Sequence, residues 1–402
     1  MNHSSPTTWC HNHMSLPAKR KICVVIINRA NYGRIKTVLQ AIQEHPDLEL
    51  QVVAGSSLLL ERHGSAVDVL RAEGFPVSAE VYMALEGETP LTMAKSVGLG
   101  VLELTSIFNH LKPDIVLTIA DRFETIATAI AASYMNILVA HTQGGEVTGS
   151  IDESVRHAVT KLAHLHFPAT KLSAERVIRM GEDPERVHMT GCPSIDIVAA
   201  MDRSFSEVDR ALIAHAGVGP AIDLDRPYLL MLQHPVTTEF AQGYDQVMET
   251  VAAVHESGLQ AIVLWPNIDA GADSVSKGLR VFREHNHEAR VRLYKNFPPE
   301  TYARILANAS CAVGNSSSFI REGAFLGTPA VVVGSRQQGR EHGANVRMDV
   351  SFDRAAILAA IRTQIAHGPY PADPIFGDGK AGKRIAEALA TAQIAVQKRL
   401  AY

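Results

Sequence analysis

The fold class follows from residues 22–33, which read ICVVIINRANYG. Residues 22–27 are uninterrupted apolar side chains, mostly β-branched, and such a run predicts a strand that is buried on both faces, as in a parallel sheet. The polar residues 28–33 form a loop, and a helical pattern of apolar residues follows as far as Ile42. A strand, a loop and a helix in this order are the repeating unit of a parallel α/β fold.

The same alternation continues along the chain. Further strands are predicted at residues 48–54, 114–119, 137–140 and 165–167, with helices at 123–135 and 154–163. After the sequence GCP at 191–193 a second series begins, with strands at 228–232, 261–265, 292–294, 312–313 and 330–333. Parallel strands joined by right-handed helical crossovers form doubly wound sheets, so we expect an α/β protein with two Rossmann-like domains that face a cleft.

The two series set the expected domain boundaries. Residues 1–20 are predicted to be a disordered tail, residues 21–193 the N-terminal Rossmann-like domain, and residues 194–380 the C-terminal one. The last predicted helix lies in residues 381–402, is amphipathic from about residue 381 to 400, and is expected to return to the first domain.

The composition excludes several classes of protein. Of the 402 residues, 46% are hydrophobic and 20% are charged, which is ordinary for a globular enzyme and excludes a disordered chain. The net charge of −4 offers no basic excess for nucleic-acid binding. No uninterrupted apolar stretch reaches the ~20 residues of a membrane span, and residues 1–21 lack the apolar core of a secretory signal. We therefore expect a cytoplasmic protein with no nucleic-acid or membrane partner.

Neither the cysteines nor the glycines indicate a cofactor. The four cysteines, Cys10, Cys23, Cys192 and Cys311, form no C-x-x-C pair and are expected to be reduced. Cys10 lies near three histidines of the tail, but their spacing matches no known zinc site. The loop at 28–33 also lacks the G-x-G-x-x-G fingerprint of NAD binding. We therefore predict no metal site and no cofactor.

Polar clusters follow the predicted strands, at the edge where ligands bind in open α/β sheets. In the first half of the chain these clusters contain Arg29, Asp121, Arg122, His141, Glu146 and Asp152. A guanidinium can pair with phosphate oxygens, and a histidine with several carboxylates can carry out acid–base chemistry. The two aspartates also have a structural explanation, because each could cap the helix that begins there.

The most specific cluster is at residues 313–323, which read VGNSSSFIREG. A strand leads through a glycine and three consecutive serines into a helix, which offers hydroxyls and free N–H groups to a diphosphate. Glu322 follows on that helix and could accept from ribose hydroxyls. The motif lacks the lysine of a Walker P-loop, so hydrolysis of a magnesium-bound nucleotide is not indicated. One domain therefore supplies a cradle for a nucleoside diphosphate, and the other supplies the acid–base groups.

Six motifs occur in an order that closely resembles the hydrolysing UDP-N-acetylglucosamine 2-epimerases of sialic acid biosynthesis. They are NRANYG at 28–33, DRFE at 121–124, HTQGGE at 141–146 with IDE at 151–153, QHPVTT at 233–238, PNIDAG at 266–271 and GNSSS at 314–318. The similarity runs from about residue 21 to the C-terminus and includes the epimerase half of the bifunctional animal epimerase and N-acetylmannosamine kinase. It implies a glycosyltransferase-B-like fold whose chemistry needs neither a metal ion nor NAD.

The resemblance also implies a reaction. UDP-N-acetylglucosamine and water give N-acetylmannosamine and UDP, by anti elimination of UDP to 2-acetamidoglucal and then hydration. The catalytic residues implied are Asp121, Glu146 and Asp152 for proton transfer and cation stabilisation, with Arg122 and His141 lining the sugar site. No sequence feature specifies the oligomeric state, which we expect to be a homodimer or a homotetramer.

A second set of residues is implied to bind the UDP-sugar. Its members are Arg29, Ala30, Gly33, Gln143, His234, Asn267, Phe297, Ser316, Ser317, Ser318, Glu322 and Arg336. Among these, Arg29, His234, Ser316, Ser317 and Arg336 are expected at the phosphates, Glu322 at the ribose, and the backbone near Phe297 at the uracil, with Asn267 nearby.

Two positions depart from the family pattern. Gln143 stands where some members have a catalytic glutamate, and a neutral amide cannot act as a base, so the base role is expected to shift, with Glu146 as the candidate. Ser57 stands where relatives have a histidine after the second strand, with His63 further downstream. This difference weakens any assignment of an acid to that loop.

The same motifs leave other functions open. A hydrolysing 2-epimerase could act on another nucleotide sugar, such as UDP-diacetamido-bacillosamine, because only the sugar pocket would differ. A non-hydrolysing epimerase would retain UDP on its product, and a glycosyltransferase of the same fold would release UDP only when an acceptor is added. A non-catalytic nucleotide-sugar sensor would bind without turnover, and the cluster of three carboxylates argues against it.

Overall fold

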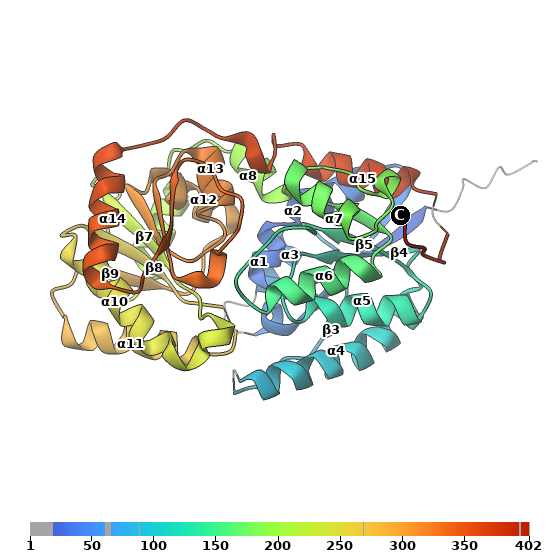
Figure 1. The fold of residues 1–402 in the computed structure, drawn as a ribbon, viewed down its shortest axis with the longest axis horizontal. Helices are drawn as coiled ribbons and strands as arrows, with labels where there is room; N and C mark the ends of the chain where they lie inside the picture. Colours follow the sequence, from blue (N-terminus) through green and yellow to red (C-terminus); the bar gives the residue numbers. More distant parts are fainter. Residues whose placement is uncertain (1–18, 61–65, 88, 268, 394, 402) are drawn as a thin grey trace, which may run out of the picture.

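The computed structural model describes residues 19–60, 66–87, 89–267, 269–393 and 395–401, without the side chains of Arg29, Ala30, Ala66 and Phe240. The chain forms two lobes, each built on a parallel six-stranded sheet, and the lobes lie side by side with helices around each sheet (Figure 1). This arrangement confirms the predicted α/β class with two Rossmann-like units in a glycosyltransferase-B-like fold.

The N-terminal lobe carries the sheet with strand order β3-β2-β1-β4-β5-β6. Its strands are β1 (Arg20–Ile26), β2 (Leu48–Gly55), β3 (Val77–Val81), β4 (Ile115–Ile119), β5 (Leu138–Thr142) and β6 (Leu165–Phe167). Its helices are α1 (Arg29–Gly33), α2 (Lys36–Glu44), η1 (Ser56–Leu59), α3 (Ala66–Ala72), α4 (Pro90–Leu111), α5 (Thr125–Tyr134), α6 (Asp152–Leu162), α7 (Lys171–Arg179) and η3 (Pro184–Arg186).

The C-terminal lobe repeats this topology with the order β12-β11-β10-β7-β8-β9. Its strands are β7 (Tyr228–Leu232), β8 (Gln260–Leu264), β9 (Val291–Tyr294), β10 (Cys311–Gly314), β11 (Ala330–Val333) and β12 (Val346–Val350). The helices after the first lobe are α8 (Pro193–Ala200), α9 (Glu207–His215), η4 (Thr237–Gln242), α10 (Gly243–Glu256), α11 (Ala272–His285), α12 (Pro299–Asn308), α13 (Arg321–Leu326), η5 (Ser335–Gln337), α14 (Arg354–His367), η6 (Pro374–Phe376) and α15 (Ala381–Thr391).

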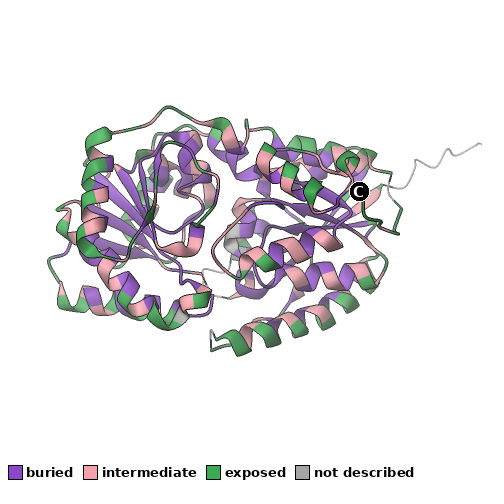
Figure 2. Ribbon diagram, viewed as in Figure 1, coloured by how far each residue is buried: buried purple, intermediate pink, exposed green. Residues whose placement is uncertain are grey.

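The central strand β1 shows why helices cover both faces of its sheet. Ile22, Val24 and Ile26 belong to one hydrophobic core, while Cys23 and Val25 belong to the core on the opposite face. Successive side chains of a strand alternate between faces, so an uninterrupted apolar run needs a helical layer on each side. Figure 2 accordingly shows the central strands of both lobes as buried.

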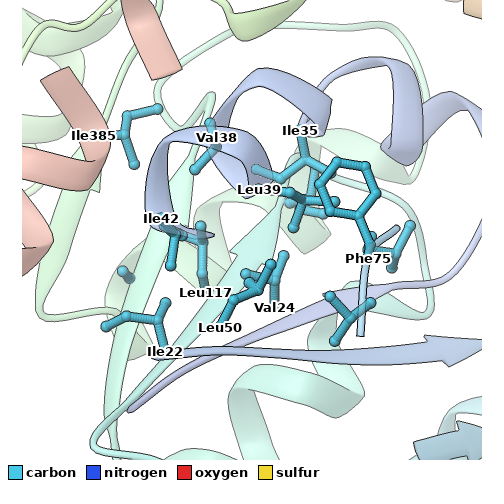
Figure 3. Packing of buried hydrophobic residues seen from close by; sticks show 14 of the residues in the cluster. Ile22, Val24, Ile35, Val38, Leu39, Ile42, Leu50, Phe75, Leu117 and Ile385 are labelled. Carbon is cyan, nitrogen blue, oxygen red and sulfur yellow. The ribbon is translucent and has the colours of Figure 1, made fainter. Parts of the chain in front are cut away.

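The core on the α2 side includes residues from both ends of the chain (Figure 3). Val38, Leu39 and Ile42 of α2 project toward the sheet at helical spacing, and Ile385 of α15 packs against them. Burial of each such side chain stabilises the fold by about 1.5–3 kcal/mol. Helix α15 therefore packs on the N-terminal lobe, although the chain reaches it from the C-terminal lobe.

Two chain segments connect the lobes next to each other. The Cys192 N–H, just before α8, donates to the Phe376 carbonyl in η6 at 2.7 Å. The Asp196 carboxylate of α8 accepts from the N–H groups of Ala381 and Gly382, at 2.9 and 2.7 Å, and so caps the start of α15. The segment that leads from the N-terminal lobe to the C-terminal lobe and the segment that leads back are thus hydrogen-bonded to each other between the lobes.

Some element boundaries differ from the sequence prediction. The sequence pattern places His141 and Thr142 in a loop, but β5 continues to Thr142, which pairs with Ile119 of β4. The last helix ends at Thr391 rather than near residue 400. Strands β3 and β12 were missed because they are edge strands whose side chains mix exposed and buried positions, so that neither forms an apolar run.

Helix α4 is long and apolar enough to cross a membrane, with a mean hydropathy of 1.3 in its most apolar window. It nevertheless contains Lys95 and Glu103, so it is not an uninterrupted apolar stretch. Its Leu104 and Phe108 side chains are buried in the core of the N-terminal lobe, where α4 packs against α5. In this structure the helix is part of the folded lobe.

Candidate active site

A cavity of about 370 Å³ lies between the lobes, at the carboxyl ends of the central strands. The N-terminal lobe contributes Tyr32, Gly33, Arg34, Val69, Asp121, Arg122 and Asp152 to its lining. The later part of the chain contributes, among others, Ser194, His234, Asn267, Lys295, Phe297, Tyr302, Ser316, Ser317, Ser318, Glu322 and Arg336. Most of the residues predicted from the strand ends therefore meet in one cavity.

Several predicted site residues lie elsewhere. His141, Gln143 and Glu146 are buried but are not part of the cavity lining. The side chains of Arg29 and Ala30 lie outside the described part of the structure, as does His63. Ser57 is buried in η1, with its hydroxyl 3.4 Å from the Ile27 carbonyl.

The three serines occupy the turn between β10 and α13. Gly314 opens this turn with a φ of +132°, and a Cβ atom there would lie 2.2 Å from the Leu232 carbonyl oxygen, so only glycine fits. The Ser317 hydroxyl accepts from Arg34 Nη2 at 2.6 Å and from Arg321 Nη1 at 3.2 Å. Two guanidinium groups beside a hydroxyl-rich turn form a site that suits a diphosphate.

His234 sits at the end of β7, beside this turn. Its backbone N–H donates to Asn315 Oδ1 at 2.7 Å, and its ring Nδ1 accepts from the Asn267 N–H at 3.2 Å. An Nδ1 that accepts a hydrogen bond leaves the proton of a neutral imidazole on Nε2. The ring can therefore donate through Nε2 from the cavity wall.

Among the described residues of the N-terminal lobe, the carboxylates that line the cavity are Asp121 and Asp152. Burial alone would raise the pKa of Asp121, but the charges of Arg156, Arg34 and Arg340 hold it well below its usual range. Asp152, the first residue of α6, has its pKa raised to about 6 by burial and by the negative charge of Asp121. Two carboxylates in one site with opposite pKa shifts are typical of acid–base catalysis.

Arg122 and Arg336 approach these carboxylates from the two sides of the cleft. Arg122 forms buried ion pairs with Glu124, at 3.3 Å, and with Asp269 of the opposite lobe. Arg336 Nη2 lies 3.5 Å from Asp152 Oδ2 and 4.0 Å from Asp269 Oδ2. Asp269 thus lies between the two guanidinium groups and helps to fix both at the cavity.

Glu146 joins the lobes. Its Oε2 atom accepts from Arg321 at 2.5 Å and from Arg340 at 2.7 Å, and both arginines belong to the C-terminal lobe. Burial would raise the pKa of Glu146, but the charges of these two arginines lower it to about 2. A carboxylate with so low a proton affinity is a weak base, so this geometry favours an electrostatic role for Glu146.

His141 is buried behind the cavity wall. Its Nε2 lies 2.7 Å from the Ala120 carbonyl and its Nδ1 lies 3.3 Å from the Thr160 hydroxyl. Burial lowers the pKa of His141 to about 3, so the ring is neutral at physiological pH. Gln143, two residues later, is also buried. Its backbone φ is +61°, a conformation that residues other than glycine rarely adopt.

The site residues expected from the sequence do not include four arginines that surround Asp121 and Glu146. These are Arg34, Arg156, Arg321 and Arg340, and all four are buried or line the cavity. Arg34 stands directly after the motif at 28–33, and Arg321 lies inside the motif at 313–323, so both could have been found there. Together with Arg122 and Arg336 they give the site the positive charge that a bound diphosphate would offset.

The carboxylates of the site show no arrangement for holding a metal ion. Among the residues that the structure describes, no group of three histidine, cysteine, aspartate or glutamate side chains could hold one. Two arginines, Arg34 and Arg321, contact the serine turn, and a guanidinium can bind phosphate oxygens without a metal ion.

Comparisons with known proteins agree on one family. Residues 40–390 match the family model described as UDP-N-acetylglucosamine 2-epimerase. The chain is 34% identical over 373 residues to the hydrolysing UDP-N,N'-diacetylbacillosamine 2-epimerase of Legionella pneumophila, covering 92% of this chain and 96% of that protein. It is 28% identical over 388 residues to the UDP-N-acetylglucosamine 2-epimerase of Neisseria meningitidis, covering 95% and 98% of the two chains.

Solved structures share the fold. The Neisseria meningitidis UDP-GlcNAc 2-epimerase bound to UDP-GlcNAc superposes with a TM-score of 0.78 at 17% identity, covering 92% of this chain and 100% of that one. The Methanocaldococcus jannaschii UDP-GlcNAc 2-epimerase in complex with UDP-GlcNAc and UDP gives a TM-score of 0.75 at 16% identity, with the same coverage.

Proposed function

The chain belongs to the UDP-N-acetylglucosamine 2-epimerase family, and we propose that it is a hydrolysing 2-epimerase that converts UDP-N-acetylglucosamine and water to N-acetylmannosamine and UDP. The observation that carries this proposal is that Asp121 and Asp152 line the same cavity as the serine turn. The turn, Arg34 and His234 would hold the diphosphate, while the two aspartates act on the hexose.

The two aspartates have different tasks in the proposed reaction. Asp152, with a pKa of about 6, has the proton affinity of an effective general base and would remove the C2 proton. The C1–O bond to UDP breaks at the same time and gives 2-acetamidoglucal. Asp121 stays ionised and would stabilise the positive charge that develops at C1 as UDP departs.

Hydration then completes the proposed reaction. Water adds its oxygen to C1, and a proton returns to the opposite face of C2, which inverts that centre and yields the free sugar. The arginines around the diphosphate stabilise the departing UDP, because they meet its charge in a buried site. Glu146 would hold Arg321 and Arg340 in place for this step instead of acting as the base.

A second substrate has specific support. The Legionella pneumophila relative acts, by its name, on UDP-N,N'-diacetylbacillosamine and is hydrolysing, and the Campylobacter jejuni relative, 28% identical over 332 residues, is named for GDP- or UDP-linked diacetylbacillosamine. We therefore propose UDP-N,N'-diacetylbacillosamine as the alternative substrate of the same site. Either product would serve the biosynthesis of a sialic acid or a related sugar.

Incubation with each nucleotide sugar tests these proposals. Proton NMR of the reaction should detect free UDP and a free 2-epimerised sugar from one of the two substrates. The appearance of a UDP-linked epimer would instead identify a non-hydrolysing epimerase. UDP release only after addition of a sugar acceptor would identify a glycosyltransferase, and binding without turnover a sensor.

We also propose that the protein is cytoplasmic and forms a homodimer or a homotetramer. The described cysteines, Cys23, Cys192 and Cys311, are free and buried, which suits a reducing compartment. The exposed apolar side chains Leu91 and Leu102 on α4 offer surface for contact between subunits. Light scattering during size-exclusion chromatography tests the oligomeric state.

A further inference from the structure

The last described segment of the chain, residues 395–401, packs on the N-terminal lobe beyond α15. Figure 1 places the C-terminus beside this lobe, away from the cleft. The Val396 carbonyl accepts from His164 Nε2 at 2.9 Å, and the Ala401 N–H donates to the Gly181 carbonyl at 3.0 Å. None of these residues lines the cavity between the lobes.

Lys398 of this segment contacts the C-terminal end of α6. Its Nζ atom donates to the Thr160 carbonyl at 3.1 Å and to the Lys161 carbonyl at 2.8 Å. Carbonyl groups of the last helical turn lack the partners that an α-helix gives to the others, and a cation there also interacts favourably with the helix dipole. Lys398 therefore caps α6 from a segment more than two hundred residues away in sequence.

The same lysine joins a buried network. Its Nζ atom lies 2.5 Å from Glu182 Oε2, and the Glu182 side chain is only 1% exposed. Glu182 also accepts from Lys161 at 2.6 Å and from His166 of β6 at 3.0 Å. A buried carboxylate with three donors holds them at defined distances, so the end of α6 is anchored to the sheet.

The other end of α6 carries two of the residues at the candidate site. Asp152 is the first residue of the helix and lines the cavity, and Arg156, one turn later, pairs with Asp121. A helix of 11 residues is about 16 Å long and behaves as a rigid unit on this scale. An anchor at one end therefore helps to set where the other end presents its side chains.

We propose that residues 395–401 position the catalytic helix α6, with Lys398 as the residue that fixes its C-terminal end so that Asp152 and Arg156 face the cleft in the productive arrangement. Lys398 is a positioning residue, since it acts through α6 and touches neither the cavity nor a reacting group. The catalytic part of this inference rests on the proposed function, whereas the structural part does not.

The proposal separates turnover from nucleotide binding. The serine turn and His234 belong to the C-terminal lobe, and residues 395–401 pack on the N-terminal one. Loss of the Lys398 contacts should therefore displace the acid–base residues while the diphosphate site stays intact. A small displacement of a catalytic group can cost one or two orders of magnitude in rate.

The test compares Lys398→Met with Arg399→Met in the full-length chain. The first substitution keeps an unbranched side chain and removes the charge that caps α6, and the second removes a neighbouring exposed cation as the matched control. In Lys398→Met we expect amide hydrogen exchange of residues 152–156 to increase by about tenfold and kcat to fall by about tenfold. The Kd for UDP should change by less than about twofold, and Lys398→Arg should restore part of the rate.

Each outcome decides between the alternatives. Unchanged exchange at residues 152–156 in Lys398→Met would overturn the proposal, as would a loss of UDP affinity as large as the loss of rate. An equal effect of Arg399→Met would show that charge alone, and not the cap, is responsible. If the wild-type chain turns over neither nucleotide sugar, the proposed function fails, and the exchange measurement still tests whether Lys398 orders α6.

Discussion

The Arg336 Nη2 atom lies 3.5 Å from the Asp152 Oδ2 atom, so a cation of the C-terminal lobe faces the carboxylate that we assign as the base. The two residues come from different lobes, and they meet only because the cleft brings both sheets together at their carboxyl ends. The proton affinity of Asp152 therefore depends on a residue that also lines the proposed phosphate site.

Arg336→Gln should move the acid limb of the pH–rate profile to higher pH. Removal of the cation disfavours the ionised form of Asp152, which raises its pKa above about 6, and the base form then requires a higher pH. We expect a shift of about one pH unit in kcat/KM. Arg347→Gln, at an exposed position on β12, is the matched control and should leave the profile in place.

Asp152→Asn should abolish turnover and retain UDP binding. The amide cannot accept a proton, whereas the serine turn, the proposed diphosphate site, is unchanged. Rate measurements together with calorimetric titration of UDP check both parts. Asp273→Asn, at the exposed start of α11, should behave as wild type. A near-normal rate in Asp152→Asn would remove it from the mechanism.

Asp121→Asn is also expected to abolish turnover, but with a loss of stability. The neutral side chain leaves Arg156 and Arg340 with less compensation in a buried site, which costs about 3 kcal/mol or more. Thermal unfolding and UDP titration distinguish the two effects. Stability equal to wild type would contradict the tight ion pairing described for Asp121.

Substitution of Ser317 and Arg34 should mainly weaken nucleotide affinity. Their mutual hydrogen bond at 2.6 Å joins the lobes at the proposed phosphate site, and a hydrogen bond to a charged group contributes about 1.5–3 kcal/mol. We expect a rise in the Kd for UDP of about ten- to a hundredfold in Arg34→Ala. Ser317→Ala combined with Arg336→Ala should have the same direction of effect. Unchanged Kd values would place the diphosphate elsewhere.

Glu146→Gln separates a structural from a catalytic role. If Glu146 holds the lobes together, its neutral variant leaves Arg321 and Arg340 without their carboxylate and lowers the free energy of unfolding by about 3 kcal/mol. If Glu146 were instead the base, turnover would vanish while stability changed little. Chemical denaturation and rate measurements on one preparation decide between the two.

His141 should make the protein less stable in mild acid. Its pKa is about 3 when folded and about 6.5 in an unfolded chain, so protonation favours unfolding. The contribution of neutral His141 to the free energy of unfolding is complete above pH 6.5. It falls by about 1.4 kcal/mol for each pH unit between the unfolded pKa of about 6.5 and the folded pKa of about 3. Thermal midpoints between pH 7.5 and 5.5 test this, and His141→Asn should show a smaller decrease than wild type.

The sequence was sufficient for ten of the twelve described strands and for most of the cavity lining. Both depend on the same local signal, an apolar run that ends in polar residues, as at Ile26 before Asn28 and at Val313 before Ser316. The order of motifs along the chain then indicated the pairing of a diphosphate turn with carboxylates. These predictions required no knowledge of contacts between distant residues.

The ion pairs could not be predicted in this way. Glu146 and Arg321 are 175 positions apart, and nothing in either local sequence shows that they meet across the cleft. The same holds for Arg122 with Asp269. The family resemblance suggests Glu146 as the base in place of Gln143, whereas its partners in the opposite lobe make it a weak proton acceptor.

The paired crossing of the chain near Cys192 and Phe376 restricts how the lobes can move. A single linker would permit twisting as well as bending, whereas a second linker hydrogen-bonded to the first opposes the twist. If the two lobes opened, the serine turn would move away from Asp152. Closing would bring the two back to the same relative position. Substrate would enter and product would leave through this opening. The serine turn and Asp152 would keep their relative orientation after each closing.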